Sequence, residues 1–272
     1  MNLLHRIFFQ LIIFSVLGQN SVAQYSLASN TRSLNSPGNY SLHFKFDSSN
    51  VKPKIQKGML IAGGAMITYG ILSLNVEFLK DWNEAVKDGV WDEKPHTGQH
   101  EIEDYLQWLP AASVYGLNLV GVKGKNNLRD RTMIYGMAML LMSSSVYFTK
   151  KISNETRPDG SDTYSFPSGH TANAFVGAEF MRMEYKDKSP WYGIGGYAAA
   201  IATGYLRMYH NKHWLGDIVA GAGFGIVSTD ISYMVYPAIK KWLFGKNKKE
   251  PSTIYMPTYN SGSFGLAMLH RF

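Results

Sequence analysis

The chain has 272 residues, enough for one domain with a sizeable core or for two small domains, and it carries a formal net charge of +7. It contains no cysteine, which excludes disulfide scaffolds, thiolate zinc sites and cysteine nucleophiles. Charged residues make up 17% of the sequence, against about 25% in a typical soluble protein, which favours a lipid environment. The positive charge favours anionic partners. Nucleic acid is the weakest of these, because no basic stripe interleaved with aromatic residues is present.

Residues 1–23 have the features of a secretory signal peptide. A short basic start precedes an apolar run over 7–18, and small residues stand at 21–23, where a cleavage site would lie. An uncleaved membrane anchor is the alternative, but the run is shorter than the roughly 20 residues that a spanning helix needs. We therefore expect export and exclude this segment from the fold.

The rest of the chain divides into a polar N-terminal segment (24–57), an apolar domain (58–240) and a basic tail (241–272). Alternating apolar residues predict a strand at 40–46 and a terminal strand or hairpin at 264–272. Six apolar segments of the domain each predict a helix: 58–79, 105–122, 132–149, 170–183, 191–206 and 214–236. The predicted fold class is therefore all-α, a six-helix bundle.

Two connections of this bundle are long, the acidic one at 80–104 and the polar one at 150–169. Long loops in a compact bundle are usually functional. In the acidic loop His96 and His100 stand near several carboxylates, so a cation site is an alternative to the solvated loop that we expect.

Polar residues beside the apolar segments form three patches that predict a single phosphate site. The patches are Lys150 with Arg157-Pro158, the sequence SFPSGHTA at 165–172, and Arg207, His213 and Asp217 in the run YLRMYHNKHWLGDIVAG.

His213 and Asp217 are four residues apart at the start of a helical segment, so the carboxylate can accept a hydrogen bond from one imidazole nitrogen. The other nitrogen is then left as a nucleophile that forms phosphohistidine. Lys150, Arg157 and Arg207 bring three cations to a transition state whose negative charge spreads over the phosphoryl oxygens. Such a site requires no metal and no other cofactor.

Ser168 and Gly169 lie where a loop enters a helix, and free N–H groups at a helix start can hold phosphate oxygens. His170, at the same opening, can protonate the departing oxygen and later activate water. A competing interpretation takes His210 and His213 as a metal-binding pair, but no third ligand stands near them in the sequence.

These residues resemble the type 2 phosphatidic acid phosphatase (PAP2) superfamily, which includes lipid phosphatases, secreted class A acid phosphatases and vanadium haloperoxidases. Its pattern of Lys-x6-Arg-Pro, Pro-Ser-Gly-His and Ser-Arg-x5-His-x3-Asp is met at Lys150, Arg157, Pro158, Pro167, Ser168, Gly169, His170, Arg207, His213 and Asp217. Only the leading Ser of the third part departs, being Leu206 here, which puts a supporting hydrogen bond in doubt. The resemblance implies that His213 is the nucleophile, that His170 is the acid and base, and that the lysine and two arginines bind phosphate.

The function implied is a metal-independent phosphatase of the bacterial cell envelope, a phosphoric monoester hydrolase acting on a phosphorylated lipid through phosphohistidine. Lipid A is the first candidate substrate, followed by undecaprenyl diphosphate, phosphatidylglycerol phosphate and phosphatidate. A secreted non-specific acid phosphatase is a further alternative. Two alternative functions come from other classes of protein: a vanadium haloperoxidase, and a protein that binds a phospholipid without hydrolysing it.

Loop charge and the signal peptide predict conflicting membrane topologies. The predicted helices are long enough to cross a bilayer, and loop charge, acidic at 80–104 but basic at 123–131, places the catalytic loops on the periplasmic face. A cleaved signal followed by six spans would instead place these loops in the cytoplasm. Either the signal is misread or not all helices cross, and the outward-facing site is the prediction that we retain.

Overall fold

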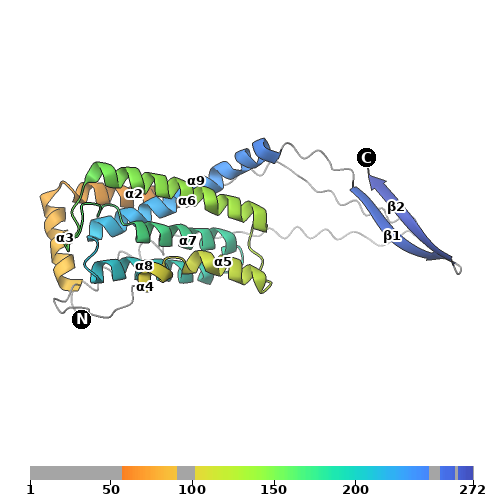
Figure 1. The fold of residues 1–272 in the computed structure, drawn as a ribbon, viewed down its shortest axis with the longest axis horizontal. Helices are drawn as coiled ribbons and strands as arrows, with labels where there is room; N and C mark the ends of the chain where they lie inside the picture. The colour runs from red at the N-terminus through yellow and green to blue at the C-terminus, as the bar shows by residue number, and fades with distance from the viewer. Residues whose placement is uncertain (1–56, 91–101, 245–251, 261–262, 272) are drawn as a thin grey trace, which may run out of the picture.

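The computed structural model describes residues 57–90, 102–244, 252–260 and 263–271 (Figure 1). The predicted signal peptide at 1–23, nearly all of the polar segment at 24–57, and His96 and His100 lie outside these ranges. The helices are α2 (Lys57–Ser73), α3 (Glu77–Val90), α4 (Ile102–Leu106), α5 (Leu109–Leu119), α6 (Leu128–Ser153), α7 (Gly169–Tyr185), α8 (Pro190–Tyr209) and α9 (Leu215–Phe244).

Two strands follow the helices near the C-terminus. β1 (Ser252–Asn260) and β2 (Ser263–Arg271) pair antiparallel, with Ser252 opposite Arg271. β2 covers most of the stretch whose alternating pattern predicts a terminal strand.

The domain from Lys57 to Phe244 is all-helical in its described residues, as the apolar segments predict, but it holds eight helices rather than six. The first predicted segment is interrupted after Ser73, where the chain bends by 96° into α3, and α4 forms at the end of the predicted acidic loop. α3 is an amphipathic helix whose Trp82, Val86 and Val90 pack against an apolar cluster formed by Met208, Leu215 and Ile218. These three apolar residues are spaced four positions apart, which is a helical spacing. The charged residues between them make this spacing hard to recognise in the sequence.

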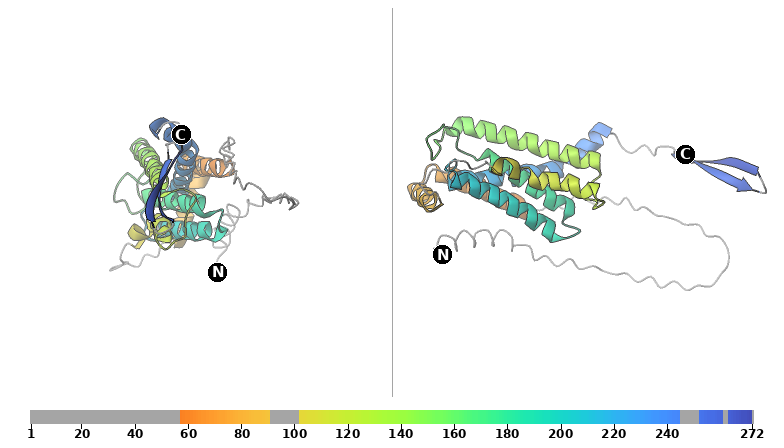
Figure 2. Two further views of the ribbon diagram at one scale, coloured as in Figure 1. Left: turned by 90° about the vertical axis from the view of Figure 1, so that its right-hand side faces the viewer. Right: turned by 60° about the horizontal axis from the view of Figure 1, so that its bottom comes forward.

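α7 is the central helix of the domain (Figures 1 and 2). It packs against α5, α6, α8 and α9, and every residue from Thr171 to Tyr185 is buried. α7 and α9 run parallel, because Gly221 lies against Ser168 near the start of α7 whereas Thr229 lies against Val176 further along it. The N-terminal ends of these two helices therefore lie together at one end of the core. The patch at 165–172 lies at the start of α7, and His213 and Asp217 of the third patch lie at the start of α9.

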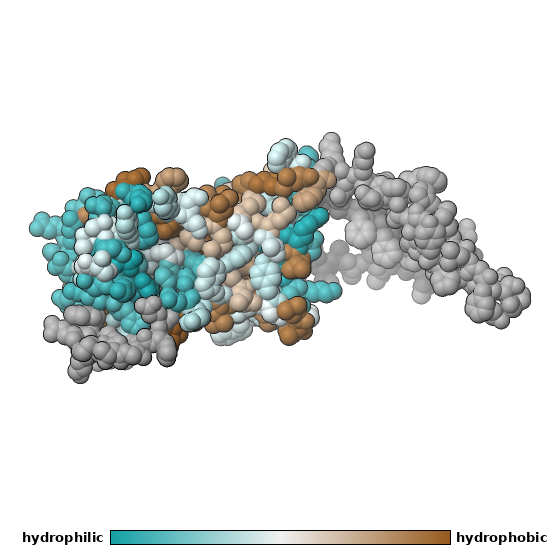
Figure 3. Space-filling view, viewed as in Figure 1, coloured by the Kyte–Doolittle hydropathy of each residue, from teal (hydrophilic) through white to brown (hydrophobic). Residues whose placement is uncertain are grey.

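Among the described residues, two helices are long and apolar enough to cross a membrane, α6 and α9, or up to three spans if α2 and α3 form one bent span. This is fewer than six spans. The most apolar stretch of α6 is only 22% buried inside the domain, whereas that of α9 is 61% buried. In Figure 3 apolar residues extend from the middle of the domain toward the end away from α3, while the end that carries α3 is hydrophilic. α6 therefore presents most of its apolar surface outward.

The close packing of α9 on α7 predicts a strong effect of a single methyl group. A Cβ added at Gly225 would lie 2.5 Å from the Ala172 carbonyl oxygen and 2.9 Å from the Val176 nitrogen, both backbone atoms. We expect Gly225→Ala to lower the free energy of unfolding by about 1–3 kcal/mol. Gly136→Ala in α6 is the matched control, because a Cβ there meets nothing within 4 Å. Thermal unfolding in detergent, followed by circular dichroism, should separate the two variants. Equal midpoints would contradict this packing.

Candidate active site

The predicted pair of His213 and Asp217 forms a buried contact at the start of α9. His213 Nδ1 lies 3.3 Å from Asp217 Oδ2, and the side chains are 2% and 1% exposed. The same carboxylate oxygen accepts hydrogen bonds from the Trp214 backbone N–H, at 2.9 Å, and from the Ser165 hydroxyl, at 2.5 Å. Asp217 is therefore held rigidly and occupies Nδ1 of the imidazole, while Nε2 of His213 has no hydrogen bond to the described part of the chain.

The start of α9 is tied to a neighbouring helix. The Gly216 N–H donates to the side-chain oxygen of Asn83 on α3, at 3.1 Å, and Asn83 is buried. Because helix starts carry backbone N–H groups without partners in the helix, this contact acts as a cap supplied from another element. It fixes the turn on which His213 stands.

The second motif forms the start of α7. Ser168 is the N-cap, and its hydroxyl oxygen accepts a hydrogen bond from the Thr171 N–H at 3.4 Å. The Ser168 N–H donates to the Asp217 carbonyl oxygen at 3.0 Å, and the residue is fully buried. Ser168 thus links α7 to α9 rather than offering a free N–H group. The N–H groups of Gly169 and His170, the first two of the helix, have no such partner among the described residues, and they remain suited to an anion.

The three predicted cations lie on three different segments, and each is held by protein oxygens. The Lys150 ammonium, in the last turn of α6, donates to the backbone carbonyls of Tyr164 and Ser165 at 2.5 and 3.1 Å. In the connection between α6 and α7, Arg157 Nε donates to Asp162 at 2.8 Å. Arg207, in the last turn of α8, is only 5% exposed.

The electrostatic interactions of His213 indicate that Lys150, Arg157 and Arg207 all lie near its imidazole. Burial, and then the positive charges of Lys150, Arg207 and Arg157, hold the pKa of His213 well below its ordinary value of 6.5, and His170 contributes in the same direction. The fold therefore brings the three patches together, as the sequence predicts. It also keeps His213 neutral at pH 7, which is the state that a nucleophile needs.

Two acidic residues beside this cluster were not predicted as members of it. Glu103, on α4, is 0% exposed, and its Oε1 lies 3.3 Å from Arg207 Nη1 and 2.6 Å from His210 Nδ1. The adjacent Asp104 lies 2.7 Å from His170 Nε2. The expectation of a solvated acidic loop is thus wrong for its final residues, because Glu103 has a buried arginine to pair with.

His210, considered above as a metal ligand with His213, instead contacts Glu103. Within the ranges that the structure describes, no group of three or more His, Cys, Asp or Glu side chains has an arrangement that could hold a metal ion.

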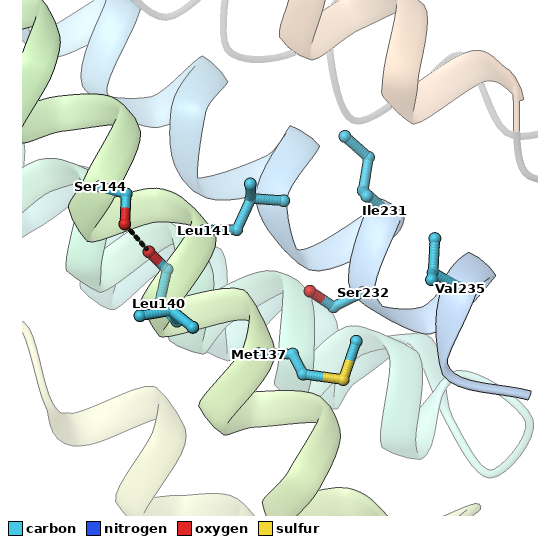
Figure 4. A pocket seen from close by; sticks show the side chains of 7 residues that line it. All are labelled: Met137, Leu140, Leu141, Ser144, Ile231, Ser232 and Val235. Carbon is cyan, nitrogen blue, oxygen red and sulfur yellow. Dashed lines mark hydrogen bonds between the residues drawn. The ribbon is translucent and has the colours of Figure 1, made fainter. Parts of the chain in front are cut away.

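A separate apolar groove of about 390 Å³ lies between α6 and α9 (Figure 4). Its lining residues are Met137, Leu140, Leu141, Ser144, Ile231, Ser232 and Val235. The two serine hydroxyls donate within their own helices, to the carbonyls of Leu140 and Ser228. The groove includes none of the motif residues, so it is not the phosphate site.

Comparison with known proteins shows what this helical domain is similar to. Residues 131–241 match the model of the PAP2 superfamily. The chain is 33% identical over 150 residues to a lipid A 1-phosphatase of Porphyromonas gingivalis. The matched residues make up 55% of this chain and 34% of that protein. It is 31% identical over 93 residues to a lipid A 4'-phosphatase of the same organism, covering 34% of this chain and 39% of that protein. The chain thus spans about a third of the length of the curated relatives it matches.

Two solved structures are similar to the chain. LpxE of Aquifex aeolicus has 23% sequence identity and a TM-score of 0.39, covering 50% of this chain and 88% of that one. A transmembrane PAP2 type phosphatidylglycerolphosphate phosphatase from Bacillus subtilis has 20% identity and a TM-score of 0.46, covering 66% of this chain and 98% of that one.

Proposed function

The chain carries a PAP2 superfamily domain, and we propose that it is a phosphatase that hydrolyses a phosphate monoester on a lipid of the bacterial cell envelope. The observation that carries this proposal is a neutral, buried imidazole, His213, held by Asp217 and surrounded by three cations. An uncharged nucleophile in a positive environment suits attack on a phosphate anion, because the cations stabilise the negative charge of the transition state.

In the proposed mechanism the phosphate oxygens lie among Lys150, Arg157 and Arg207, and near the N–H groups at the start of α7. His213 Nε2 attacks phosphorus to form phosphohistidine, and His170 gives a proton to the departing alcohol oxygen. Water then attacks phosphorus while His170 takes up its proton, which releases inorganic phosphate and restores His213.

The lipid class of the substrate is supported by two observations. α6 and α9 are candidate membrane spans, which supports a bacterial membrane protein. The curated relatives are lipid A phosphatases. We propose lipid A as the substrate, with undecaprenyl diphosphate and phosphatidylglycerol phosphate as alternatives, and a site that faces the periplasm.

The decisive experiment measures phosphate release by the purified full-length chain from lipid A, undecaprenyl diphosphate, phosphatidylglycerol phosphate and phosphatidate in mixed micelles. We expect turnover of lipid A, unchanged activity in EDTA, and inhibition by vanadate, whose oxyanion resembles the transition state. No phosphate release from any of these lipids would contradict the function, and loss of activity in EDTA that one metal restores would contradict the mechanism. Halide oxidation with vanadate and peroxide would favour the haloperoxidase instead.

The pH dependence of activity follows from the two imidazoles. His213 must be unprotonated, so kcat/KM should rise as pH increases through its lowered pKa. His170 must be protonated, and burial and Arg207 lower its pKa below the ordinary 6.5, so kcat/KM should fall as pH increases through that value. We therefore expect a bell-shaped profile with its maximum on the acid side of neutrality. Activity that rises steadily into alkali would contradict these roles.

A further inference from the structure

The candidate acid and base, His170, has a carboxylate partner outside the three motifs. Asp104 Oδ1 lies 2.7 Å from His170 Nε2, although the two residues are 66 positions apart in the sequence. The side chains of His170 and Asp104 are 31% and 42% exposed, so a ligand has access to both. A second imidazole–carboxylate pair therefore stands beside the pair formed by His213 and Asp217.

Asp104 is held in place by the short helix that carries it. Its neighbour Glu103 is fully buried and contacts Arg207 and His210, as described above. On the next turn, the Gln107 side chain accepts a hydrogen bond from Asn173 of α7 at 3.0 Å. The same side chain donates to the Asp104 carbonyl oxygen at 3.0 Å. α4 is thus fixed to both α7 and α8, and the contact with His170 differs from an ion pair between two freely moving surface side chains.

The charged groups around His170 act in opposite directions. Burial and the positive charge of Arg207, from α8, lower the pKa of His170. Asp104 raises it through a hydrogen bond and its charge, and Glu103 raises it through its charge. The two α4 carboxylates therefore oppose the loss of the His170 proton, which burial and Arg207 favour.

We propose that Asp104 is the positioning residue for His170, orienting its imidazole and retaining its proton for transfer to the leaving group. This inference rests on the proposed phosphatase function. In the first half-reaction the P–N bond to His213 forms, the ester P–O bond breaks, and the leaving oxygen takes a proton from the His170 nitrogen that Asp104 leaves free. In the second, water bonds to phosphorus, its proton passes to His170, and the P–N bond breaks. Asp104 keeps its hydrogen bond to His170 throughout.

The kinetic test compares Asp104→Asn with Asp88→Asn, which removes the same charge from α3. Asp88 is 71% exposed and lies 3.5 Å from Lys87. General acid catalysis contributes typically ~10²–10⁴-fold, and asparagine keeps part of the contact, so kcat of Asp104→Asn on a lipid phosphate should fall about 10-fold to 100-fold. The limb on which kcat/KM decreases with pH should move to lower pH. Asp88→Asn should leave both unchanged. An unshifted limb in Asp104→Asn would overturn the inference.

The leaving group provides a second readout that a merely structural role would not give. 4-Nitrophenyl phosphate releases a stable phenolate that needs no proton, whereas a lipid alcohol needs one. In single-turnover measurements, Asp104→Asn should therefore slow the release of 4-nitrophenolate, which reports formation of phosphohistidine, much less than it slows release of the lipid alcohol. In a His170→Ala background, adding Asp104→Asn should cause no further loss, because the two residues act as one unit. Equal losses in this first step with both substrates, or a full additional loss in that background, would contradict the proposal.

A titration of His170 itself makes the test independent of turnover. Nuclear magnetic resonance of chain labelled with ¹⁵N-histidine, with His170→Ala to assign the signal, reports the pKa of this imidazole directly. We expect a lower pKa in Asp104→Asn and no change in Asp88→Asn, and an unchanged pKa in Asp104→Asn would overturn the inference. If the wild-type chain releases no phosphate, the proposed function fails, while this titration still decides the role of Asp104.

Discussion

Replacing His213 by alanine is expected to lower kcat on the preferred lipid phosphate by about 10⁴-fold or more. The reason is that the variant lacks the nucleophile but keeps the three cations, so phosphate binds and is not transferred. Phosphate release over time measures kcat, and binding of vanadate, followed by calorimetry, should remain detectable in the variant. Retention of turnover within 10-fold of the wild type would contradict the nucleophilic role.

The intermediate provides a direct control for this prediction. The His170→Ala variant, given 4-nitrophenyl phosphate, should form phosphohistidine but hydrolyse it slowly, since water lacks its base. The trapped phosphate should be labile in acid and stable in alkali, as expected of a P–N bond. It should be absent from the double variant His170→Ala with His213→Ala. Phosphate recovered on any other residue would contradict the mechanism.

Replacing Arg207 by methionine should reduce both activity and stability. The guanidinium is one of the three predicted phosphate ligands, so kcat/KM should fall about 10²–10³-fold. The side chains of Arg207 and Glu103 are 6% and 0% exposed, and removing the arginine leaves the buried carboxylate without its permanently charged partner, with His210 still in contact. We expect the free energy of unfolding to decrease by about 3 kcal/mol. Phosphate release and unfolding in urea measure the two effects.

A second substitution separates these effects. Adding Glu103→Gln removes the carboxylate charge that has lost its arginine, so the double variant should regain stability to within about 1 kcal/mol of the wild type. Its activity should remain low, because the cation is still missing. Recovery of activity together with stability would mean that Arg207 has only a structural role.

Sequence predicts contacts between residues that are close in the chain, but not contacts between residues that are far apart. His213 and Asp217 are four positions apart, which predicts their contact, and the contact is present at 3.3 Å. The helical spacing itself is not present, because α9 begins at Leu215 and His213 lies just before it. Asp104 and His170 are 66 positions apart, and no local pattern links them. Their contact depends on how α4 packs on α7 and α8, which is a property of the tertiary fold.

Two further differences between prediction and structure have a physical origin. Composition marks Glu103 as part of an acidic, solvated loop, but Arg207 and His210 pair with it, and a buried carboxylate is tolerated when it is paired. Ser165 lies inside the second patch, but the sequence assigns it no role, because the role of a serine hydroxyl depends on its hydrogen-bond partner. That partner is Asp217, 52 positions away.

The bend of 96° between α2 and α3 has a consequence for where the reaction takes place. α2 packs along α9, and if α9 crosses the bilayer, a helix nearly perpendicular to α2 lies parallel to the membrane plane. α3 also caps the turn that carries His213, through Asn83. The reacting phosphorus is thereby expected at the depth of the headgroups. An embedded lipid could be dephosphorylated there without its tails ever leaving the hydrocarbon layer.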